Sequence, residues 1–103
     1  MSADASVWAE DGVFRVRGAL GFSTVAGLWD EGLPLFRRLS GPCELDVSRV
    51  ERVDSAGVAL LVEWMRLARE RGAVLRITGA PPAMRDLIQL ADLQDLLPVT
   101  SFQ

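Results

Sequence analysis

The residues with the clearest potential for chemistry are Asp54-Ser55-Ala56-Gly57, which come just before a long segment with helical apolar spacing. Asp and Ser are preferred at the N-cap of a helix, because a side-chain oxygen there accepts a hydrogen bond from a free backbone N–H. The local pattern therefore predicts that Asp54 or Ser55 caps a helix. The Ser55 hydroxyl is also a candidate for phosphorylation, which would add about −1.5 to −2 charge at pH 7, and Gly57 leaves room for the backbone of a partner.

Catalytic groups are scarce in this chain. It contains no histidine, lysine or tyrosine, so it has no Ser-His or Cys-His pair and no Schiff-base lysine. The single cysteine, Cys43, has acidic neighbours and lies in a segment that resembles a strand, which favours a structural thiol. One cysteine without histidine cannot form a structural zinc site. We therefore expect neither enzymatic activity nor a cofactor or metal.

Composition limits the class of protein further. The chain has 103 residues, half of them apolar, and a net charge of −3. This length predicts a single domain over residues 1–103, and the negative charge disfavours a nucleic-acid partner. We find no secretory signal and no apolar run near the ~20 residues that would span a bilayer. We expect a cytoplasmic protein without direct membrane insertion.

Strand-like and helix-like segments alternate along most of the chain. Asp11-Gly12 between two short apolar segments predicts an N-terminal hairpin. Gly32 and Pro34 predict a kink or break within the first helix, and Ser23 or Thr24 is its expected cap. The expected strands are 6–9, 13–18, 43–47, 74–78 and, more weakly, 99–102; the expected helices are 24–39, 55–71 and one that begins at Pro81-Pro82; residues 48–53 are expected to form a connection. This order predicts an α/β fold with a mostly parallel sheet of four or five strands.

The segment 55–71 is more apolar than an ordinary surface helix. Its apolar arc covers roughly 220°, against the ~100° or somewhat more of a typical amphipathic helix. One interpretation is that this helix packs on both the sheet and a neighbouring helix. The alternative is that one flank, Leu60-Trp64-Leu67 or Val58-Val62, is exposed to a partner. Trp64 is the best candidate anchor in that case, since tryptophan is enriched at binding hot spots.

Two stretches resemble the STAS domain shared by anti-sigma-factor antagonists. They are Leu45-Asp46-Val47-Ser48-Arg49-Val50 and Val53-Asp54-Ser55-Ala56-Gly57-Val58-Ala59-Leu60-Leu61. The likeness extends from Phe14 to Pro98. It implies the STAS fold, with helices packed on the sheet, and a binding function without catalysis.

Within this family, one branch is the anti-sigma-factor antagonists, in which a partner kinase phosphorylates a hydroxyl residue just after the aspartate. Ser55 matches that position, so the resemblance implies Ser55 as the phosphorylation site. A second hydroxyl is common at the next position, where this chain has Ala56. The acidic Gly-Glu-Leu-Asp stretch of many members is replaced here by Gly18-Ala19-Leu20-Gly21.

The other branch is the small STAS subunit of the Mla phospholipid ABC transporter, and this is the interpretation we favour. The chain is similar to it in Leu28-Trp29, in the stretch 48–54, in Ala59-Leu60-Leu61 and in the stretch 67–72. The resemblance implies a subunit at the inner membrane that binds the transporter's ATPase and, through it, the permease. The expected partner-binding residues are Asp54, Ser55, Ala56, Gly57, Val58 and Trp64.

Overall fold

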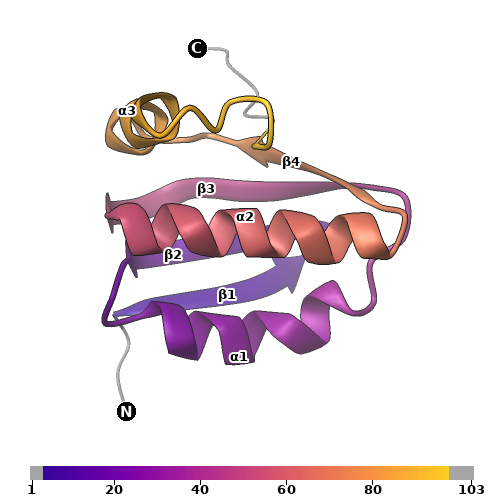
Figure 1. The fold of residues 1–103 in the computed structure, drawn as a ribbon. Coiled ribbons are helices and arrows are strands. Elements are labelled where there is room, and N and C mark those ends of the chain that lie inside the picture. Colours follow the sequence, from indigo (N-terminus) through magenta and orange to yellow (C-terminus); the bar gives the residue numbers. More distant parts are fainter. Residues whose placement is uncertain (1–3, 98–103) are drawn as a thin grey trace.

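In the computed structural model, which describes residues 4–97, the chain folds into a four-stranded sheet with helices packed on it (Figure 1). The strand order is β1-β2-β3-β4, with β1 antiparallel to β2 and the other neighbours parallel. The elements in chain order are β1 (Ala5–Glu10), β2 (Val13–Leu20), α1 (Val25–Phe36), β3 (Pro42–Val53), α2 (Ser55–Glu70), β4 (Val74–Thr78) and α3 (Pro82–Leu90). The predicted α/β class, element order and mostly parallel sheet are confirmed.

The N-terminal hairpin forms as predicted. Asp11 and Gly12 have positive φ angles of 54° and 78°, the pair of left-handed residues that a tight hairpin turn requires. The expected last strand, 99–102, lies outside the described residues. Among the described helices, none is both long and apolar enough to cross a membrane.

Strand β3 is longer than predicted, and the expected connection over residues 48–53 is wrong. The strand continues to Val53, which pairs with Leu20 of β2. Its register against β2 shifts twice, between the pairs Arg15↔Asp46 and Arg17↔Arg49 and again after Gly18↔Val50. Each shift places an extra residue in β3, which interrupts the two-residue alternation by which a strand is recognised.

Helix α1 runs without a break from Val25 to Phe36 through Gly32 and Pro34, so the predicted break is wrong. It ends three residues before the expected Leu39. Thr24 is the N-cap residue, but its hydroxyl donates to Ala19 O at 2.7 Å instead of capping the helix.

The apolar arc of α2 is explained by packing on two sides. Trp64 is fully buried and stacks on Phe36 of α1 at a centroid distance of 5.1 Å. On the two flanks that we considered for a partner, Val58 and Leu60 are buried, and Val62 and Leu67 are half-buried against the core. Neither flank is exposed, so the expectation that Trp64 anchors a partner is wrong.

Candidate functional site

The start of α2 is organised by the carboxylate of Asp54. Its Oδ1 accepts hydrogen bonds from the backbone N–H groups of Ala56 at 2.9 Å and Gly57 at 3.1 Å. Asp54 is therefore the N-cap of the two residues considered, and Ser55 is the first residue of the helix. The hydrogen bond from Gly57 N–H, with those from Phe22 and Ala56, holds the pKa of Asp54 below its ordinary value against the effect of desolvation.

Gly57 has a role inside the fold. It is buried, and a Cβ at this position would lie 2.3 Å from the backbone oxygen of Leu20. The glycine allows α2 to begin directly against the end of β2, so a partner's backbone cannot reach it here. The interpretation of Gly57 as an opening for a partner is wrong.

The predicted site residues fall into two groups. Asp54 and Ser55 are exposed and Ala56 is half-buried, so these three form an accessible helix start. Gly57, Val58 and Trp64 are buried and are not accessible to a partner. Phosphorylation of Ser55 remains a prediction, and the serine is accessible to a modifying enzyme.

An apolar groove of about 280 Å³ lies beside Ser55, between α2 and α3. Leu90, at the end of α3, is 85% exposed on its wall. The groove is lined by Ser55, Val58, Ala59, Leu87, Leu90, Ala91 and Leu93. Sequence reasoning missed this contribution of α3, although Leu90 stands two residues after the buried Ile88 and so on a different face of the helix.

Phe22 lies on the other side of the helix start and was also missed. Its side chain is 83% exposed, and its backbone N–H donates to Asp54 Oδ2 at 3.2 Å. A shallow pocket that Asp54 shares with the loop between β2 and α1 has Phe22 in its wall. The sequence signal that could have indicated Phe22 is an aromatic residue just after the end of a strand, between Gly21 and Ser23.

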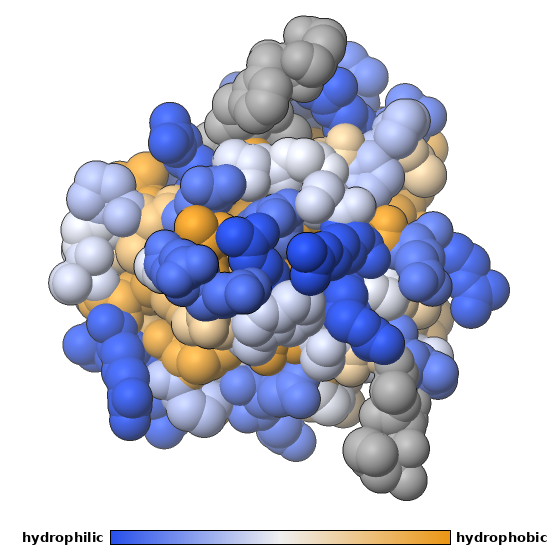
Figure 2. Space-filling model, turned by 180° about the vertical axis from the view of Figure 1, so that it is seen from behind, coloured by the Kyte–Doolittle hydropathy of each residue, from blue (hydrophilic) through white to orange (hydrophobic). Residues whose placement is uncertain are grey.

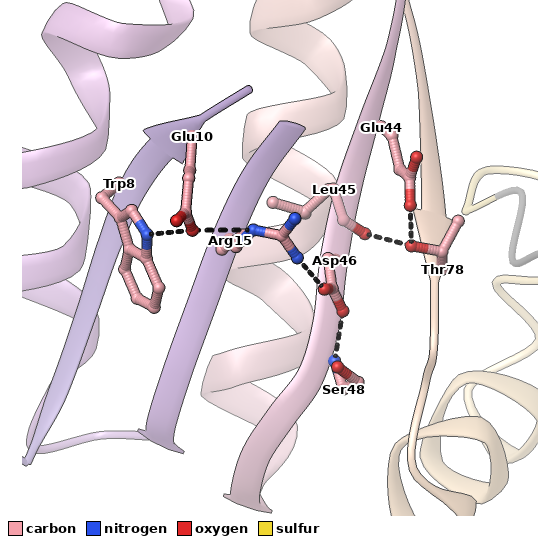
Figure 3. Close-up of polar contacts among 8 residues, drawn as sticks. All are labelled: Trp8, Glu10, Arg15, Glu44, Leu45, Asp46, Ser48 and Thr78. Atoms are coloured by element: carbon pink, nitrogen blue, oxygen red, sulfur yellow. Dashed lines mark hydrogen bonds and ion pairs between the residues drawn. The ribbon is translucent and has the colours of Figure 1, made fainter. Parts of the chain in front are cut away.

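The outer face of the sheet, away from α1 and α2, carries a line of polar contacts (Figure 3). Trp8 Nε1 donates to Glu10, Glu10 pairs with Arg15 Nε at 3.1 Å, and Arg15 Nη1 contacts Asp46 Oδ2 at 2.5 Å. Asp46 Oδ1 accepts from the N–H of Ser48 at 2.9 Å. These charges satisfy one another across three strands, and hydrophilic side chains cover the middle of this face in Figure 2.

Burial raises the pKa of Asp46, but the hydrogen bonds from Ser48 and the charge of Arg15 outweigh it and leave that pKa below its ordinary value. Within residues 4–97, no group of three or more His, Cys, Asp or Glu side chains is placed to hold a metal ion.

Comparison with known proteins agrees with this architecture. Residues 6–98 match the family model described as "Mlab, STAS domain", and the chain belongs to this STAS family. No curated protein matches.

Three solved structures share the fold. One is an anti-sigma factor antagonist from Mycobacterium paratuberculosis, with 23% identity over 98% of this chain and 90% of that chain and a TM-score of 0.77. The second is an anti-sigma-factor antagonist (STAS) domain protein from Planctomyces limnophilus, with 19% identity over 100% of this chain and 93% of that chain and a TM-score of 0.77. The third is a sulfate transporter family protein from Wolinella succinogenes, with 19% identity over 89% and 79% and a TM-score of 0.68. The predicted STAS fold is confirmed.

Proposed function

We propose that this chain, as a single STAS domain over residues 1–103, is a non-catalytic accessory subunit of a Mla-type phospholipid ABC transporter. In this role it lies in the cytoplasm and binds the ATPase subunit, and through it the permease in the inner membrane. The family description "Mlab" supports this branch of the family. Ala56 and the non-acidic Gly18-Ala19-Leu20-Gly21 stretch depart from the anti-sigma pattern.

One observation carries the location of the binding surface. Among the described residues, the two most exposed large apolar side chains are Leu90 and Phe22, and they flank the helix start at Ser55 from opposite sides. Exposed apolar side chains with polar groups beside them are typical of a protein interface, whose apolar parts are bordered by polar residues. The docking surface of the proposal is therefore Ser55 with Phe22, Leu90 and the groove between α2 and α3.

The direct test is purification of the tagged full-length chain from its own cells, with identification of the co-purified proteins. We expect an ABC-type ATPase and its membrane permease. Recovery of an anti-sigma kinase without these proteins would contradict the proposal.

Titration of the purified ATPase then locates the surface. Ser55→Trp should block binding of the ATPase sterically. Leu90→Glu should weaken binding by about tenfold or more, since loss of a hot-spot contact costs roughly 1.4 kcal/mol or above. Val74→Glu is the matched control, because Val74 is 59% exposed but lies on β4 beside Gly41, away from the groove. Equal affinities for all three variants would remove this surface from the proposal.

A second candidate function is an anti-sigma-factor antagonist switched by phosphorylation of Ser55. The exposure of Ser55 at the start of α2 favours it, because a partner kinase would need access to the hydroxyl. Intact mass measured from cells in several growth states tests it. A species heavier by about 80 Da, one phosphate, that disappears in Ser55→Ala would support this function, and its absence in every state would contradict it.

A further inference from the structure

The two oxygens of the Asp54 carboxylate act in different directions. Oδ1 caps α2 through Ala56 and Gly57, whereas Oδ2 accepts the N–H of Phe22 from the loop after β2. The backbone N–H of Asp54 also donates to Leu20 O at 3.0 Å. One residue therefore joins the start of α2 to the segment that carries Phe22.

The backbone on the N-terminal side of Phe22 is fixed from a second direction. Gly21 N–H donates to Thr24 Oγ1 at 3.0 Å, and the same hydroxyl donates to Ala19 O. A Cβ on Gly21 would lie 2.6 Å from Asp54 Oδ2, so only glycine lets the loop approach the carboxylate this closely. The loop is thus held in place while the Phe22 ring stays 83% exposed.

This combination does not serve the stability of the isolated chain, because an exposed aromatic ring adds little to the core. It does serve binding. A side chain whose backbone is already fixed loses less conformational entropy when a partner covers it. Aromatic side chains, phenylalanine included, are enriched in protein interfaces relative to the rest of the surface.

We propose that Asp54 is a positioning residue that holds Phe22 as a preformed apolar anchor for the ATPase, on the side of Ser55 opposite the groove. This inference rests on the proposed function. It assigns to the ATPase an apolar pocket for the Phe22 ring, separate from the part of the ATPase that covers Leu90 and the groove.

The two uses of the carboxylate can be separated by one substitution. Asparagine caps helices as well as aspartate does, but it has a single acceptor oxygen and an NH₂ donor group. In Asp54→Asn the oxygen can still accept from Ala56 and Gly57, and the NH₂ group then faces the N–H of Phe22 without bonding to it. The variant should keep the cap and lose the tether.

Two measurements test the inference on the full chain. Amide hydrogen exchange should show faster exchange at Phe22 in Asp54→Asn, with Gly57 still protected. Titration with the purified ATPase should show about tenfold weaker binding for Phe22→Ala and a similar or smaller loss for Asp54→Asn. The double variant should bind no more weakly than Phe22→Ala, because the tether acts only through the ring. Val74→Ala is the control for loss of an exposed apolar side chain elsewhere.

The outcomes separate this inference from the proposed function. If the wild type binds the ATPase and both single variants bind equally well, the anchor is wrong and the proposed function stands. If the losses of the two variants add in the double variant, or if Phe22 exchange is unchanged in Asp54→Asn, Asp54 does not position the ring. If the wild type does not bind the ATPase, the proposed function fails and the anchor role fails with it.

Discussion

The outer face of the sheet and the surroundings of the start of α2 differ in whether their side chains have partners within the fold. On the outer face, Arg15 pairs with Glu10 and Asp46, and Asp46 also accepts the N–H of Ser48, so these charged groups find partners within the fold. At the start of α2, Phe22 and Leu90 remain largely uncovered. Polar groups that already pair with one another within the fold do not require a partner. The free energy falls when a partner covers exposed apolar side chains, because their surface is removed from water.

Asp46 and Asp54 show the same contrast at the level of single residues. Each has one oxygen bound to the backbone N–H of the residue two positions further on. The second oxygen of Asp46 contacts Arg15 on the neighbouring strand, but the second oxygen of Asp54 binds the loop that presents Phe22. Similar local geometry thus joins two strands of the sheet in one place and holds the loop that carries Phe22 in the other, where we propose the binding surface.

The largest expected effect distinguishes buried from exposed apolar residues. Trp64→Ala removes a fully buried ring stacked on Phe36, and we expect it to lower the free energy of unfolding by about 3–5 kcal/mol. Leu90→Ala, at an 85% exposed side chain, should change it by less than about 0.5 kcal/mol. Urea unfolding of both variants measures the difference. Comparable losses in the two would mean that Leu90 belongs to the core and not to the docking surface.

An intermediate effect concerns the support beneath the helix start. Gly57→Ala places a methyl group against the backbone oxygen of Leu20, and we expect a loss of about 1–3 kcal/mol in the free energy of unfolding. Gly27→Ala in α1 is the matched control, since its added Cβ would have no atom within 4 Å apart from its chain neighbours and the backbone of its own helix. That variant should gain roughly 0.5–1 kcal/mol from better helix propensity. A neutral or stabilising Gly57→Ala would show that α2 can move away from β2.

The smallest effect lies on the outer face and depends on pH. Because the pKa of Asp46 is lowered in the folded state, its ionised form contributes stability above the ordinary pKa of about 4, and this contribution is lost as the pH falls below that value toward the lowered pKa. Asp46→Asn should cost about 1 kcal/mol at pH 7, the typical worth of one hydrogen bond or partly buried ion pair.

In acid, the free energies of unfolding of Asp46→Asn and the wild type should lie closer together than at pH 7. Chemical unfolding at pH 7 and near pH 3 measures the difference in free energy of unfolding at each pH. Asp54, whose pKa is also lowered, makes both proteins less stable in acid and so does not account for a change in the difference between them. A difference between wild type and Asp46→Asn that grows as the pH falls would contradict the assigned direction.

Several features could be predicted from the sequence because they depend on neighbours along the chain. The hairpin at Asp11-Gly12, the cap at Asp54 and the length of α2 follow from turn preference, capping and helical spacing. The full extent of β3 could not be predicted, because its two register shifts break the alternation that identifies a strand. The helix break expected at Pro34 did not occur, because packing of α1 on β1 and on Trp64 overrides a local preference.

For the proposed binding surface, the sequence by itself determined where to look. Asp54 and Ser55 identify the helix start through residue type and spacing alone. Only the tertiary structure decided which side chains surround it, because burial depends on contacts between segments distant in the chain. That is why Trp64, the strongest candidate by residue type, is buried against Phe36 and Gly32 of α1. Phe22 and Leu90, from a loop and from the end of α3, are exposed on either side of Ser55.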